Sequence, residues 1–105
     1  MFEVKIVLST VDTAETAGLI ARTLVTERLA ACVGILPPMI SVYRWKEELH
    51  EDQESQLIIK TAADRVDALM RRLKEIHPYE VPEILVLPVS GGLDAYFDWV
   101  SSETR

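Results

Sequence analysis

Two hydrophobic periodicities alternate along this chain in an order that few folds can accommodate. Apolar residues recur at every second position from Phe2 to Leu8, which predicts a strand. A capping signal follows at 12–15, and apolar residues then recur at helical spacing over 17–25. This predicts a first helix that ends near residue 28 or 29. The chain therefore begins with a strand and an amphipathic helix.

The middle of the chain predicts a long hairpin. The apolar run 30–36 is typical of a buried strand, and two prolines after it predict a break or bulge. Residues 39–45 alternate again, 46–55 form a polar connector, and 56–61 return as a strand. The hairpin therefore joins the first half of the chain to the second.

The second half repeats the helix–strand order. We expect Asp64 to cap a helix whose apolar positions run over 66–76. An apolar strand follows at 84–89, and Gly91 then precedes a short last helix around 93–100. Two βαβ-like halves joined by a hairpin indicate a ferredoxin-like α+β fold, a split βαβ sandwich with extended hairpin strands. We expect one domain, 1–105.

In this fold the helices cover one face of an antiparallel sheet. Val7, Cys32 or Val33, and the apolar residues of the last strand indicate that the other face is not polar throughout. No part of the chain is left to cover that face. Association of several copies through sheet faces or edges is therefore expected.

Composition narrows the classes of partner. One cysteine excludes an intramolecular disulfide, and neither a leader-like segment nor an apolar run of about 20 residues is present, so we expect a soluble cytoplasmic protein. A net charge of −6 argues against nucleic acid or an anionic membrane as the main partner, because both reward basic patches. Metal cations and basic partners remain compatible with this charge.

The segment between the second helix and the last strand, 77–83, holds one imidazole, one phenol, two carboxylates and two prolines. Each proline favours an extended preceding residue, so His77 and Val81 are expected to be extended and the connector stiff. The segment is either a boundary between elements or a binding segment. In the second case His77 would be a metal ligand and Glu83 would add charge, although no tetrahedral ligand spacing is present.

Other candidate residues have two interpretations each. Cys32 is a packed thiol, or a soft metal ligand if His77 approaches it in space. His50 lies among five carboxylates in 47–54, which form a solvated hairpin tip or a site for cations.

Two tryptophans and one lysine lie where core or interface contacts are expected. Trp45 and Trp99 pack in the core or at an interface. Lys60 either extends its ammonium to solvent or pairs with a carboxylate such as Glu83. The sequence shows no nucleophile elbow, glycine-rich phosphate loop or strong acid–base pair, so we predict no enzyme.

Four separated motifs resemble the CutA family of divalent-cation tolerance proteins. They are 28–33, 41–45, Glu54 with 59–61, and 77–83, and they follow the family's order, as do 87–89 and 96–99. The resemblance implies a ferredoxin-like subunit in a stable homotrimer similar in architecture to the PII signalling proteins. It also implies a cytoplasmic protein linked to tolerance of copper and other divalent ions.

The resemblance implies a metal site only in part. Some bacterial relatives have cysteine and histidine at the positions of Ser9 and Ile76, so that only His77 matches the copper site of those relatives. A Cu²⁺ or other divalent ion would then be weakly bound, unless Cys32, Glu80, Glu83 or a neighbouring subunit adds donors, and folding would require none.

The resemblance also implies a ligand cleft between subunits. The residues that match the family there are Trp45, Lys60, Tyr79, Glu83 and Trp99. The leading hypothesis is a homotrimeric protein that binds or responds to divalent metal ions such as copper. The alternative is a PII-like sensor of a small anionic or nucleotide ligand, with Lys60 and Arg44 as candidate contacts, and a third is an enzyme using Cys32 with His77.

Overall fold

The computed structural model describes residues 3–105, which form one sheet and three helices. The elements follow in the order β1 (Val4–Val11), α1 (Ala14–Thr26), β2 (Cys32–Ile35), β3 (Met39–Trp45), β4 (Glu48–Ala62), the 3₁₀ turn η1 (Ala63–Arg65), α2 (Val66–Ile76), β5 (Leu85–Pro88) and α3 (Asp94–Glu103). Phe2, which the alternation assigns to the first strand, lies outside the described residues. None of the helices in 3–105 is long and apolar enough to cross a membrane.

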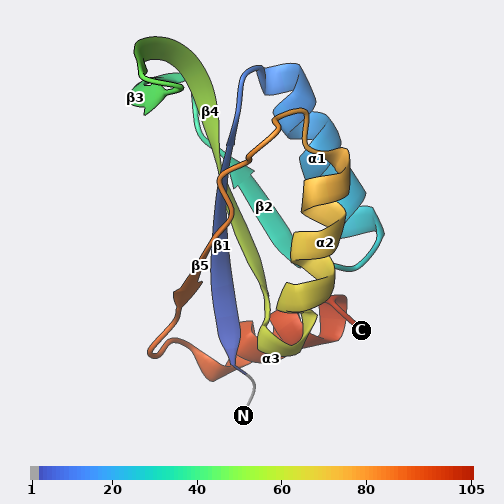
Figure 1. The fold of residues 1–105 in the computed structure, drawn as a ribbon. Helices are drawn as coiled ribbons and strands as arrows, with labels where there is room; N and C mark the ends of the chain where they lie inside the picture. The colour runs from blue at the N-terminus through green and yellow to red at the C-terminus, as the bar shows by residue number, and fades with distance from the viewer. Residues whose placement is uncertain (1–2) are drawn as a thin grey trace.

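The sheet has the strand order β2-β4-β1-β5, with every neighbouring pair antiparallel. Helices α1 and α2 lie side by side against one face, and α3 crosses one end of the molecule (Figure 1). This arrangement confirms the predicted ferredoxin-like α+β fold.

The hydrophobic core lies between the sheet and the helices α1 and α2. Val7 and Val11 of β1 belong to it, together with Ile20, Leu24, Leu57, Ile59, Leu69 and Leu73. The expectation that Val7 lies on the open face is therefore wrong. Apolar residues at 6, 7 and 8 fit either face, so alternation alone could not choose between them.

Helix α3 covers only one end of the sheet face that α1 and α2 leave uncovered. Phe97 and Val100 pack against Val4 and Ala31 there. The rest of that face carries Ile6, Leu8 and Ile58, which are half-buried in the single chain.

The predicted polar connector 46–55 is wrong, because almost all of it belongs to β4. The register pairs Trp45 with Glu48, so only Lys46 and Glu47 form the turn, and both have positive φ, 49° and 67°. A two-residue turn of this kind usually carries glycine or asparagine, so its sequence gave little signal. The resulting hairpin arm, β3 with the first half of β4, extends beyond the sheet (Figure 1).

The two prolines create the predicted bulge where the arm leaves the sheet. Ile35 pairs with Leu57, and Met39 pairs with Glu54. The four residue steps from 35 to 39 therefore lie opposite only three steps on β4, from 57 to 54. An extra residue of this kind bends a strand. The bulge therefore redirects the arm.

Both edge strands are shorter than expected, and the first is also more exposed. The predicted buried strand 30–36 is β2, of which Cys32 and Val33 are half-buried and Gly34 and Ile35 exposed. The predicted strand 84–89 is β5, four residues that are all exposed. Edge strands lack a neighbour on one side, so apolar composition alone does not bury them.

The cap of α1 lies where the sequence predicts it. Within the predicted capping signal 12–15, the cap of α1 is Thr13, whose side chain accepts a hydrogen bond from the Thr16 N–H at 3.1 Å. Helix α1 ends at Thr26, slightly before the predicted end.

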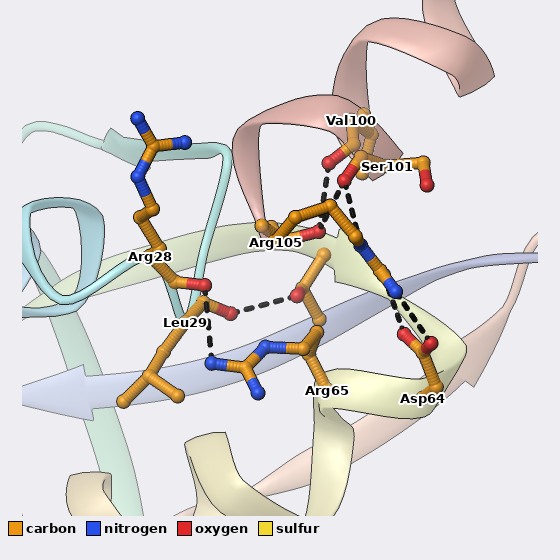
Figure 2. Close-up of polar contacts among 9 residues, drawn as sticks. Arg28, Leu29, Asp64, Arg65, Val100, Ser101 and Arg105 are labelled. Carbon is orange, nitrogen blue, oxygen red and sulfur yellow. Dashed lines mark hydrogen bonds and ion pairs between the residues drawn. The ribbon is translucent and has the colours of Figure 1, made fainter.

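Asp64 does not cap α2, because η1 places it one turn before the helix. Its carboxylate instead accepts two hydrogen bonds from Arg105, at 2.6 and 2.7 Å, which tie the end of the chain to η1 (Figure 2). Nearby, Arg65 donates to the Arg28 carbonyl at 3.5 Å, although its Nε is buried without a partner. This corner therefore holds the C-terminal segment in place.

Candidate functional site

An open cavity of about 600 Å³ lies between the hairpin arm and the 77–83 connector. Five carboxylates line it: Asp12, Asp52, Glu54, Glu80 and Glu83. Three aromatic side chains line it as well: Tyr43, Trp45 and Tyr79. Among the described residues no lysine or arginine contributes to the lining. The cavity is therefore acidic and aromatic.

Strand alternation places two aromatic and two acidic side chains of the arm on the cavity side, and Gln53 also reaches the lining. Tyr43 and Trp45 lie two apart on β3, and Asp52 and Glu54 lie two apart on β4. The intervening residue Arg44 is on the opposite face of the arm and does not line the cavity. The structure therefore does not place Arg44 where a ligand of this cavity would meet it.

Glu54 is the most buried carboxylate of the cavity. The residue is 9% exposed, and its Oε2 accepts a hydrogen bond from the Tyr79 hydroxyl at 2.7 Å. Burial, and then the Glu54 carboxylate, raise the pKa of the Tyr79 phenol above its ordinary value of 10.0. The pair fastens the connector to the base of the arm.

A second phenol–carboxylate pair lies further along the arm. The Tyr43 hydroxyl donates to Asp52, and this hydrogen bond raises the pKa of Tyr43. The Tyr43 ring stacks on the imidazole of His50 at 5.3 Å. His50 therefore lies on a paired strand of the exposed arm, near the solvated hairpin tip, and within 3–105 it belongs to no group of three metal-ligating side chains.

His77 has a structural role in this chain. Its Nδ1 accepts a hydrogen bond from the Tyr79 backbone N–H at 3.1 Å, and its Nε2 lies 2.8 Å from the Thr10 carbonyl oxygen. A carbonyl can only accept, so Nε2 carries the hydrogen and the Nδ1 lone pair is already used. The residue is 7% exposed and its backbone is extended, as predicted. His77 thus has no free nitrogen for a metal.

Glu83 and Gln56 fasten the other end of the connector. The Gln56 amide donates to Glu83 at 3.0 Å and to the Ser9 carbonyl at 2.7 Å. A pairing of Glu83 with Lys60, one of the two alternatives for this lysine, is not observed. The Lys60 ammonium lies instead 5.9 Å from the centre of the Tyr96 ring.

Cys32 does not approach His77. Cys32 pairs with Lys60 of β4, whereas Thr10, which His77 contacts, pairs with Gln56. Lys60 and Gln56 are four residues apart on β4, so the two pairs lie about 13 Å apart along the strand. The thiol is half-buried rather than fully packed, because it lies on the sheet face that α1 and α2 do not cover.

The copper site of some relatives does not fit this chain. The Ser9 hydroxyl is fully buried without a hydrogen-bond partner, and Ile76 packs on the core. Both His77 nitrogens are engaged. Elsewhere in 3–105, no three histidine, cysteine or acidic side chains group closely enough to hold a metal ion.

The five expected cleft residues fall into two groups. Trp45, Tyr79 and Glu83 line the acidic cavity. Lys60 lies by Tyr96, whose ring is 5.5 Å from that of Trp99, towards the α3 end of the sheet. The single chain therefore does not bring these five residues together.

Sequence reasoning missed several cavity residues. No site prediction names Asp12 or Tyr43, and the alternative of a cation site in 47–54 includes Asp52 and Glu54 without singling them out, although all four line the cavity. Alternation in 39–45 placed Tyr43 and Trp45 on one face, but the matching acidic face of β4 lay inside the predicted connector. Recognising 48–54 as a strand would have revealed Asp52 and Glu54.

The fold and the cavity define a class of protein: a small ferredoxin-like domain with a largely uncovered sheet face and an acidic, aromatic cavity beside a hairpin arm. Residues 5–103 match the family model described as CutA1 divalent ion tolerance protein. The chain belongs to this family.

Individual relatives agree with the family assignment. The "Divalent-cation tolerance protein CutA" of Thermus thermophilus is 48% identical over 95% of this chain and 97% of its own length. A solved structure of the Thermus thermophilus protein superposes with a TM-score of 0.93 over 97% of this chain and 99% of that one, at 47% identity. A CutA1 structure from Ehrlichia chaffeensis gives a TM-score of 0.95 at 31% identity, covering 100% and 98% of the two chains.

A Tyr79→Phe variant tests the phenol–carboxylate pair. A phenol with a raised folded pKa contributes stability that is complete below pH about 10 and is lost as pH rises through the folded pKa. The variant should lose about 1 kcal/mol at pH 7, since Glu54 loses a donor, and its stability should fall less steeply above pH about 10. Urea unfolding between pH 7 and 11 measures both effects, and identical pH slopes in variant and wild type would contradict the pairing.

Proposed function

We propose that this chain forms a cytoplasmic homotrimer that binds or responds to divalent metal ions such as Cu²⁺, by binding rather than by catalysis. Family membership and the names of the relatives support the link to divalent cations. Some relatives carry chloroplastic or periplasmic names, so the family alone does not fix the compartment. A lone cysteine is compatible with a reducing compartment.

The trimer is supported by apolar surface that the single chain leaves bare. Ile40, Val42 and Leu49 share the face of the arm turned away from the cavity and are 60–74% exposed. Leu85, Val86 and Leu87 are exposed along the edge strand β5. Surfaces of this kind usually mark contacts with another chain.

One observation carries the cation part of the proposal: five carboxylates line a single cavity without an opposing basic side chain in the described chain. Carboxylates favour hard cations, and the engaged His77 leaves no imidazole for Cu²⁺ there. Binding of metal ions should therefore be weak and sensitive to salt.

Calorimetric titration with Cu²⁺ and Zn²⁺ tests this function. The double variant Asp12→Asn, Glu80→Gln removes two exposed cavity charges, and Glu15→Gln, Asp67→Asn removes two exposed helix charges as a matched control. Only the first pair should weaken binding, by about tenfold. The proposal fails if neither metal binds above the nonspecific level, or if both pairs weaken binding equally.

The second candidate is a PII-like sensor with a small-ligand cleft between subunits. The cavity volume, within the range of small-molecule sites, and the two separated groups of expected cleft residues favour it. A thermal-shift screen that compares nucleotides and metabolites with Cu²⁺ and Zn²⁺ separates the two functions. A melting temperature that rises with a nucleotide or metabolite but with neither metal supports the sensor.

A further inference from the structure

We infer that the acidic cavity binds a small organic cation carrying a primary ammonium group, rather than a nucleotide or another anion. The inference rests on the proposed function, since both place a cation in this cavity, but it names a different chemical class of ligand. A short aliphatic diamine is the simplest probe of that class.

The first argument is the charge of the cavity. An anionic ligand would approach five carboxylates with no basic side chain of the described chain to oppose them. Arg44 lies on the other face of the arm, and Lys60 lies by Tyr96. The local field therefore attracts cations and repels phosphates and carboxylates.

The second argument is the buried carboxylate of Glu54. It receives one neutral hydrogen bond, from Tyr79, and the ion pairs found in residues 3–105 all involve carboxylates outside the cavity. A carboxylate this deeply buried is costly unless a cation or several donors compensate it. An ammonium group at the cavity wall would supply both charge and donors.

The third argument separates an organic cation from a bare metal ion. The described residues offer no group of three ligands for a metal. A cavity of about 600 Å³ is far larger than an ion needs, and its walls include Tyr43, Trp45 and Tyr79. Aromatic faces attract ammonium groups and also contact the methylene body of an amine.

Calorimetry with diaminobutane tests the inference at constant ionic strength, with butanediol and succinate as neutral and anionic probes of the same chain length. Only the diamine should bind wild type. Glu54→Gln should weaken its binding by at least about tenfold. The matched control Glu51→Gln, an exposed carboxylate three residues away that does not line the cavity, should change binding less than about twofold.

Fluorescence locates the bound amine. Trp45 and Trp99 are the two tryptophans, so in a Trp99→Phe background the emission reports Trp45 alone. Diaminobutane should change that emission with the same affinity as in calorimetry. An unchanged emission together with calorimetric binding would place the amine elsewhere and overturn the inference.

The remaining outcomes distinguish the inference from the proposed function. Binding of Cu²⁺ without binding of the diamine would overturn the inference and leave the metal proposal standing. Binding of the diamine without binding of either metal would support the inference and overturn the metal proposal. If diaminobutane does not bind and Glu54→Gln changes the subunit number measured by light scattering, a neighbouring subunit occupies the cavity and the inference fails.

Discussion

A His77→Ala variant should lose about 3 kcal/mol of unfolding free energy, equally with and without metal. The imidazole bridges the Thr10 carbonyl and the Tyr79 N–H in a largely buried position, and its removal leaves both groups without partners. Each unsatisfied buried group costs about 1–3 kcal/mol, and the lost packing adds to this. Urea unfolding in chelator and in excess Zn²⁺ measures the loss.

The chain provides a matched control, since His50 is the other of its two histidines. Its ring stacks on Tyr43 on the exposed arm, so His50→Ala should cost less than about 1 kcal/mol. If His77→Ala instead leaves stability unchanged and abolishes metal binding, His77 is a ligand and its structural role is refuted.

If the chain forms the proposed trimer, an Ile40→Asp variant should convert it to monomers at micromolar concentration. Ile40 lies on the outer face of the arm with an exposed fraction of 66% in the single chain. Burying its side chain contributes about 1.5–3 kcal/mol per copy, whereas an aspartate buried without a partner costs several kcal/mol. Light scattering after size-exclusion chromatography gives the subunit number.

Leu19→Asp is the control for this change. Leu19 has a similar exposed fraction, 60%, but lies on the helix α1 and not on the arm. It should leave the subunit number unchanged, and circular dichroism should show both variants folded. A wild-type monomer, or an Ile40→Asp protein that remains trimeric, would contradict the assigned interface.

Local patterns predicted elements better than their ends. The period-two and helical patterns located the core-forming elements, because burial of one face imposes those periods. Asp64 shows that a local pattern does not fix where a helix begins. Aspartate is a normal capping residue, but η1 precedes α2 and the Asp64 carboxylate binds Arg105. The arm shows that a local pattern can also miss a strand, because seven mostly polar residues, 48–54, form a strand by pairing with β3.

The candidate site was predicted in part. The sequence left the 77–83 connector as either a boundary between elements or a binding segment, and four of its residues line the cavity. Its histidine was chosen for ligand chemistry, which the residue type allows but the surrounding hydrogen bonds oppose. The partners that decide this, Thr10 and Tyr79, include one that lies 67 residues away in sequence.

The sequence by itself determined the order of the elements, the ferredoxin-like class and the family, because these depend on periodicity and on motifs that are local in the chain. Only the tertiary structure decided which face Val7 occupies, that His77 has no free lone pair, and that Asp12, Glu54 and Glu83 line one cavity. Such properties depend on contacts between distant segments, and it is these contacts that fix hydrogen-bond partners, burial and local charge.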